Sequence, residues 1–235
     1  LIANAVKAAE ENLQPVEMST AIATEESVSF IRRFKMVDGS VGWNPGKLNP
    51  KIVAPVGTID PSIPVIVFDA PGGAARHRPL ATFVDFAHHL AARGAGHMTL
   101  FTLGCAGNIN HSVVKRADPQ KGHGEAARIG AILGGDVLKV LPSAKPVATA
   151  SAALRVQREV VKLPIQAVAA GDVEWAKETL ANYGAPGARP FLDQVKAFRV
   201  LELAERNGAP IEAEVQVITV GDEVAWVGLP GEIFV

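Results

Sequence analysis

The chain alternates between two hydrophobic periods, and this alternation limits the folds that it can adopt. Residues 16–22 carry apolar or strand-favouring side chains at every second position, which is the spacing of a strand. Residues 124–141 carry apolar side chains three and four positions apart, which is the spacing of a helix. Because both periods recur along the chain, the sequence predicts an α/β fold of the mixed α+β kind, with central mixed β-sheets flanked by helices.

The predicted elements are separated by glycine and proline. The periods predict further strands at residues 63–68, 80–88, 98–103 and 154–161, and a final hairpin at 211–220 and 224–229. They predict further helices at residues 1–13, 172–182 and 191–206, with Asp172 as an N-cap and Gly208 as a C-terminal stop. Residues 38–64 are rich in turn signals, so we expect a long excursion there with little regular structure.

Charge and composition exclude some classes of protein. Of the 235 residues, 48% are hydrophobic and 20% are charged, which is typical of a globular enzyme or binding domain. The formal net charge is −1 without a basic block, so nucleic acid and anionic membranes are not favoured partners. No apolar run is long enough to span a bilayer. Because Cys105 is the single cysteine, the chain cannot form an internal disulfide. We expect Cys105 to be a small buried residue and not a nucleophile.

The last eight residues deliver one carboxylate from a turn. An apolar strand at residues 224–229 runs into Pro230-Gly231, and Glu232 follows. A glutamate at such a turn suits metal ligation or base chemistry, although many such side chains are only solvated. The sequence then stops inside an apolar run, so we expect residues 1–235 to be one partial domain, truncated at both ends.

Three other stretches carry groups suited to catalysis or binding. In a strand, Asp85, Ala87 and His89 share one face and His88 lies on the other. An imidazole at the end of such a strand suits zinc, with a carboxylate two positions back on the same face to orient it; the alternative is a histidine that hydrogen-bonds a neighbouring loop. Arg32 and Arg33, between aromatic residues, suit the clamping of a carboxylate or an oxyanion, or else a surface ion pair.

The third stretch is a small-residue loop at residues 104–111, directly after a predicted strand. It presents the carboxamides of Asn108 and Asn110 and the imidazole of His111, a set that suits a carbonyl, sugar or phosphate group. It lacks the lysine and hydroxyl residue that end a P-loop. The alternative is a turn whose asparagines satisfy their own backbone.

Five stretches, in this order, resemble the neutral/alkaline non-lysosomal ceramidase family, especially its bacterial ceramidase-like branch. They are residues 29–34, 44–61, 79–89, 101–111 and 215–232. The resemblance implies a zinc-dependent amidase that cleaves the N-acyl bond of ceramide-like lipids. It implies that His89 and Glu232 are two of four zinc ligands, with a second histidine and a tyrosine outside these residues. It also implies export or a periplasmic location.

The resemblance also assigns roles around the scissile amide. Arg32 resembles an arginine near that amide, and residues 107–110 resemble a Gly-Asp-Val-Ser loop in which this chain has Asn108 and Asn110. We therefore expect zinc-assisted hydrolysis of a small-molecule or lipid substrate, with oxyanion stabilisation by Arg32, Asn108 or Asn110 and His111 as the acid. The alternatives are hydrolysis of another amide or ester, and a non-catalytic module whose 104–111 loop binds a polar ligand such as a sugar.

Overall fold

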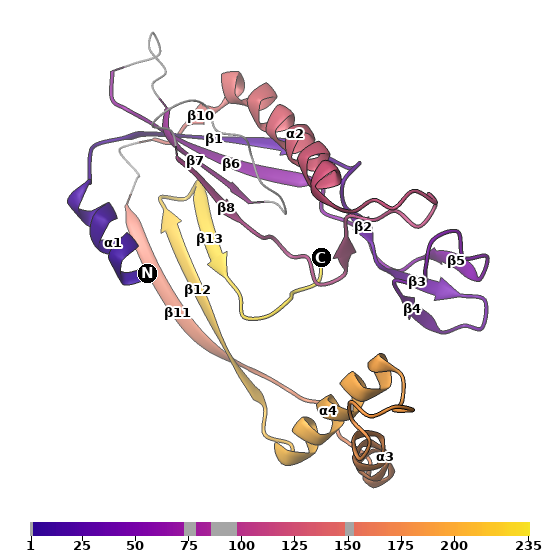
Figure 1. Cartoon of the computed structure of the whole chain (residues 1–235). Helices are drawn as coiled ribbons and strands as arrows, with labels where there is room; N and C mark the ends of the chain where they lie inside the picture. The colour runs from indigo at the N-terminus through magenta and orange to yellow at the C-terminus, as the bar shows by residue number, and fades with distance from the viewer. Residues whose placement is uncertain (1, 73–78, 86–97, 149–152) are drawn as a thin grey trace. The chain divides into compact units, whose positions relative to one another are not determined.

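The protein is built from two compact units. The computed structural model describes residues 2–72, 79–85, 98–148 and 153–235 (Figure 1). One unit contains Leu1–Ala152 and Gly231–Val235, and the other contains Ala153–Pro230. Helices are combined with mixed and antiparallel sheets, which confirms the predicted α+β class.

The first unit is organised around a five-stranded mixed sheet. Its strand order is β10-β1-β6-β7-β8, with β7 and β8 parallel and the other neighbours antiparallel. The strands are β1 (Glu17–Thr24), β6 (Ser62–Asp69), β7 (Pro79–Asp85), β8 (Met98–Thr102) and β10 (Lys145–Pro146). The strands predicted at 16–22, 63–68 and 98–103 are confirmed; the one predicted at 80–88 is confirmed as far as Asp85, and the rest lies outside the described residues.

One helix covers this sheet and closes the core. Helix α2 (His123–Val140) buries Ile129, Leu133 and Val137, which lie four residues apart on one face. They pack against a cluster that includes Ile63 and Val65 of β6, both at most 1% exposed. Figure 1 shows α2 lying along the sheet. The helix ends in a short 3-10 turn, Leu141–Ser143.

Two smaller sheets accompany the main sheet, and one of them draws two strands from residues 38–64. Strand β3 (Arg33–Met36) pairs with β4 (Val41–Trp43) and β5 (Ile52–Pro55). Strand β2 (Phe30–Ile31) pairs with β9 (Ile109–Asn110). The expectation for residues 38–64 was therefore wrong in part, because β4, β5 and the start of β6 lie there.

The second unit combines a three-stranded sheet with two helices. Its antiparallel strands are β11 (Leu154–Leu163), β12 (Ile211–Val220) and β13 (Val224–Gly228). Helices α3 (Ala170–Leu180) and α4 (Phe191–Glu205) lie between β11 and β12 in the sequence. The predicted helices and hairpin are confirmed. The N-cap prediction was wrong: Ala169 caps α3, and Asp172 lies in its first turn.

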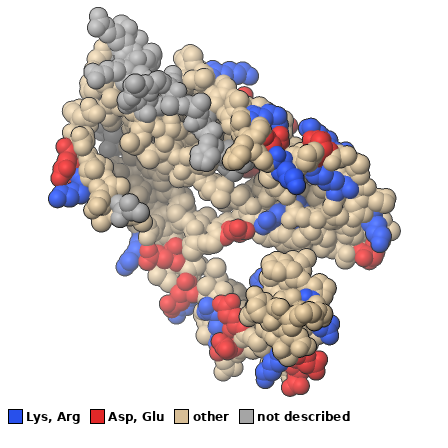
Figure 2. Space-filling view, in the orientation of Figure 1, with Lys and Arg blue, Asp and Glu red and all other residues tan. Residues whose placement is uncertain are grey.

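The remaining predicted helix is α1 (Ile2–Glu11), which buries no residue. In the part of the chain that is described, no helix is both long and apolar enough to cross a bilayer. On the face in Figure 2, acidic and basic side chains are interspersed.

Candidate functional site

A short strand pair brings Arg32 to the loop of residues 104–111. Phe30 pairs with Asn110 and Ile31 pairs with Ile109. Directly after this pair, the backbone N–H of Arg32 donates to the carbonyl of Asn108 over 3.0 Å. Two stretches that the sequence analysis singled out separately are therefore joined by backbone hydrogen bonds.

The Arg32 guanidinium connects this loop to Glu232. Its Nε and Nη2 donate to the carbonyl oxygen of Gly107 over 3.0 and 2.5 Å. Nη2 also lies 3.3 Å from Oε2 of Glu232. The ring of Trp43 lies 5.1 Å from the guanidinium carbon, within range of a cation–π interaction. Arg32 is therefore held from three directions, and it lies beside the carboxylate that the closing turn delivers.

The segment of residues 231–235 lies along the same loop. The backbone N–H of Gly107 donates to the carbonyl of Ile233 over 2.8 Å. The N–H of Val235 donates to Oδ1 of Asn108 over 3.0 Å. Gly107 is required here, because a β-carbon at that position would overlap the carbonyl oxygen of Glu232 and lie 2.6 Å from Cδ1 of Phe234.

The predicted loop side chains have different surroundings. Asn108 is only 2% exposed, and its carboxamide faces the protein interior. Asn110 is half-buried; its Nδ2 donates to Oδ1 of Asn44 over 2.9 Å, and its Oδ1 accepts a hydrogen bond from the Ser112 N–H. His111 donates from Nε2 to the carbonyl of Gln120 over 3.0 Å, since a carbonyl oxygen only accepts.

A pocket of about 370 Å³ opens beside this loop. Its wall includes Asp60, Asp85, Cys105, Ile109 and Val235. Asp85 ends β7 and accepts a hydrogen bond from the Thr102 hydroxyl over 2.8 Å. Cys105 is exposed, so the expectation that it is buried was wrong; it lies in the turn after β8, where its side chain borders the pocket.

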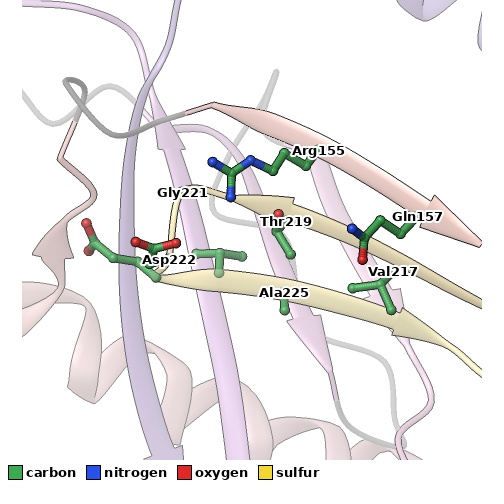
Figure 3. A pocket seen from close by; sticks show the side chains of 9 residues that line it. Arg155, Gln157, Val217, Thr219, Gly221, Asp222 and Ala225 are labelled. Atoms are coloured by element: carbon green, nitrogen blue, oxygen red, sulfur yellow. The ribbon is translucent and has the colours of Figure 1, made fainter.

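The second unit has a hollow of its own, of about 380 Å³ (Figure 3). Arg155 and Gln157 of β11 lie opposite Thr219 and Val217 of β12, so the four side chains share one face of the sheet. None of the candidate catalytic or metal-binding residues from the sequence analysis lines this hollow.

The predicted metal site is only partly within the described structure. Glu232 is accessible, with 80% of its side chain exposed, so its carboxylate suits a metal ligand. His89 lies outside the described residues. Within the ranges that the structure describes, no three histidine, cysteine, aspartate or glutamate side chains group in a way that could hold a metal ion. Of the two residues expected to bind zinc, the described structure therefore contains Glu232.

Sequence reasoning missed the partners that hold these groups. Phe234 packs against Trp43 with ring centroids 5.8 Å apart, and the Arg33 guanidinium lies 5.1 Å from the Phe234 ring. The contact of Trp43 with Arg32 depends on the β3–β4 pairing, which has no sequence signal of its own.

Comparisons with known proteins give a fold and no sequence match. No known protein family and no curated protein matches the sequence. Among solved structures, neutral ceramidase from Pseudomonas aeruginosa is similar with a TM-score of 0.53 and 15% identity, over 94% of this chain and 41% of that one. The chain shares the fold of a neutral ceramidase.

A second solved structure agrees with the first. A ceramidase complexed with C2 is similar with a TM-score of 0.51 and 14% identity, over 92% of this chain and 42% of that one. The chain thus spans about two-fifths of each ceramidase. At this identity the likeness establishes the fold alone.

Proposed function

We propose that this chain is part of a zinc-dependent hydrolase that cleaves the N-acyl bond of a ceramide-like lipid or a related N-acyl amine. The observation that carries the proposal is the 3.3 Å contact between Arg32 and Glu232, within a fold shared with neutral ceramidase. The contact joins an anion-binding group to a candidate metal ligand, and both were singled out from the sequence.

The residues fit a metal-assisted amidase in their donor chemistry. Glu232 would be one zinc ligand and His89 a second, and the remaining ligands would come from outside these 235 residues. When bound, zinc supplies a Lewis acid and makes water nucleophilic at neutral pH. The reaction consumes water and an amide and yields a carboxylate and an amine.

The chain's own residues would orient and stabilise the reacting amide. The Arg32 guanidinium is held by the Gly107 carbonyl and the Trp43 ring, so its positive charge is preorganised for a developing oxyanion. One donor of this kind is worth about 3 kcal/mol. Asn110 is more accessible than Asn108 and is the better candidate for a second donor. We assign the protonation of the leaving amine to His111, whose Nε2–H group donates to the carbonyl of Gln120.

The test is zinc content and hydrolysis in the full-length protein that contains these residues. We expect close to one zinc per protein, lost in Glu232→Gln and in His89→Ala. Glu212→Gln and His123→Ala are matched controls, because both side chains are exposed on other elements. A panel of N-acyl sphingoid bases, other N-acyl amines and simple esters then identifies the bond cleaved. A folded full-length protein without zinc would exclude the proposal.

The pocket beside the loop favours one alternative, a non-catalytic module that binds a polar ligand such as a sugar. Asp60, Asp85, Ser29 and Ser62 line it, and their oxygens are suitable acceptors for hydroxyl groups. Its volume of about 370 Å³ suits a small ligand. Calorimetric titration with mono- and disaccharides tests this function; binding that Asp85→Ala abolishes, in a protein without zinc, would establish it.

A further inference from the structure

The buried carboxamide of Asn108 lies where three chain segments meet. Its Oδ1 accepts the N–H of Val235, and its backbone carbonyl accepts the N–H of Arg32. On the opposite side, a β-carbon added at Gly57 would lie 3.6 Å from Nδ2 of Asn108. At 2% exposure this side chain is enclosed by protein, so its contacts are with the chain itself.

The hydrogen bonds of the loop fix the register of the 231–235 segment. Ile233 and Val235, two residues apart, are the positions that bond to Gly107 and Asn108. In an extended segment the intervening side chains then share the other face. Glu232 and Phe234 occupy that face, and they contact Arg32 and the Trp43 ring respectively. A slip of one residue would turn Glu232 away from Arg32.

We propose that Asn108 is a positioning residue that holds Glu232 in place, in contrast to the direct catalytic role that the sequence suggested. By accepting the Val235 N–H, the carboxamide keeps residues 231–235 in the register that presents the Glu232 carboxylate to Arg32. The proposed metal site gives Glu232 its chemistry, so the effect on zinc rests on the proposed function; the effect on the segment does not.

Two substitutions separate the hydrogen bond from the volume of the side chain. Asn108→Asp keeps an acceptor oxygen for the Val235 N–H, and Asn108→Leu keeps a similar volume without an acceptor. Asn110→Leu is the matched control in the same loop, because the Asn110 carboxamide bonds to Asn44 and not to the 231–235 segment.

Hydrogen exchange of residues 231–235 is the first measurement, made on the full-length protein. We expect Asn108→Leu to accelerate exchange at least tenfold, and we expect Asn108→Asp and Asn110→Leu to stay within about threefold of wild type. Unchanged exchange in folded Asn108→Leu would overturn the proposal. If that variant does not fold, Asn108→Ser is measured with the same expectation, because its shorter hydroxyl does not reach the Val235 N–H.

Zinc affinity is the second measurement, and it distinguishes positioning from general loosening. We expect Asn108→Leu to raise the Kd for zinc about tenfold and Asn108→Asp to restore it. Faster exchange in Asn108→Leu in a protein that binds no zinc would retain the positioning role and reject the proposed function. Zinc binding with equal affinity in all variants would reject a role for Asn108 in presenting Glu232.

Discussion

Arg32 shows how a single side chain can join segments that are far apart in the sequence. Its guanidinium contacts Gly107, Glu232 and Trp43, which lie in three different parts of the chain. A planar group with five donors can satisfy a carbonyl, approach a carboxylate and stack on an indole at once, and a lysine ammonium cannot. The identity of this residue therefore matters to local stability as well as to the proposed chemistry.

Removing this side chain is predicted to destabilise the first unit. Arg32→Ala leaves the Gly107 carbonyl without two charged donors, at a part-buried position, and should cost about 2 kcal/mol in the free energy of unfolding. Urea denaturation measures this cost. The control is Arg116→Ala, whose partner Asp118 is a neighbour in an exposed loop, and which should cost under about 0.5 kcal/mol. Equal costs for the two variants would contradict the prediction.

At this scale the sequence indicated the residue types but not their partners. Arg32 and Glu232 were candidates because of the groups they carry, yet 200 positions separate them and no local pattern predicts their contact. The exposure of Cys105 was mispredicted because small apolar residues are usually buried, whereas here the turn after β8 leaves the side chain at a pocket wall.

Among the secondary-structure elements, those with a long hydrophobic period were predictable. The strand β6 and the helix α2 each carry several apolar residues in register, and their burial follows from that pattern. Strands β2, β4 and β9 have two or three residues each, too few for an alternation to be recognised. They form because their partners are brought close by the rest of the fold, which is a tertiary effect.

The carboxyl group of Asp136, in α2, lies near that of Glu25, the residue directly after β1. Burial, and then the neighbouring Glu25, raise the pKa of Asp136 above its ordinary value. Burial also opposes ionisation of Glu25, but hydrogen bonds from Ser27 outweigh it and lower the pKa of Glu25. The buried Oδ2 of Asp136 has no hydrogen-bond partner among the described residues. Ionisation of Asp136 is therefore less favourable in the folded protein than in the unfolded chain.

The pH dependence of stability follows from the direction of the Asp136 shift. A carboxyl whose pKa is higher in the folded state binds its proton more tightly there, so its contribution favours folding at low pH and is lost as the pH rises through that pKa. Asp136→Asn should raise the free energy of unfolding at pH 7 by about 0.5 kcal/mol, allowing for solvent screening. The gain should fall as the pH drops through the folded-state pKa of Asp136, and it should vanish below the ordinary pKa of an aspartate.

Thermal unfolding of the wild type and of Asp136→Asn between pH 3 and pH 8 measures how the gain in stability depends on pH. Glu10→Gln, on the exposed surface of α1, is the control for the general effect of removing a negative charge. A gain that is the same at every pH would show that the amide acts through packing and not through ionisation.

For the whole molecule, the main feature is that the first unit is interrupted in sequence by the second. Residues 231–235 belong to the first unit although residues 153–230 separate them from the rest of it. This arrangement was not predictable, because nothing in the composition of the Pro-Gly-Glu turn indicates that the chain returns to the 104–111 loop. The likeness to two ceramidase structures at 14–15% identity shows that a similar fold can form from sequences with few residues in common.

The second unit is predicted to have a low free energy of unfolding when it is isolated. Its buried hydrophobic residues are Ala176, Ala197, Ala213 and Val224, and each contributes little area, whereas all ten residues of β11 are exposed. A core of this size cannot offset the conformational entropy of ordering residues 153–230, so the isolated segment should have a free energy of unfolding below about 2 kcal/mol. Far-UV circular dichroism in urea should show a gradual loss of signal in the isolated segment and a cooperative transition in the intact protein. A cooperative transition in the isolated segment above 3 M urea would mean that its sheet and helices are a self-sufficient domain.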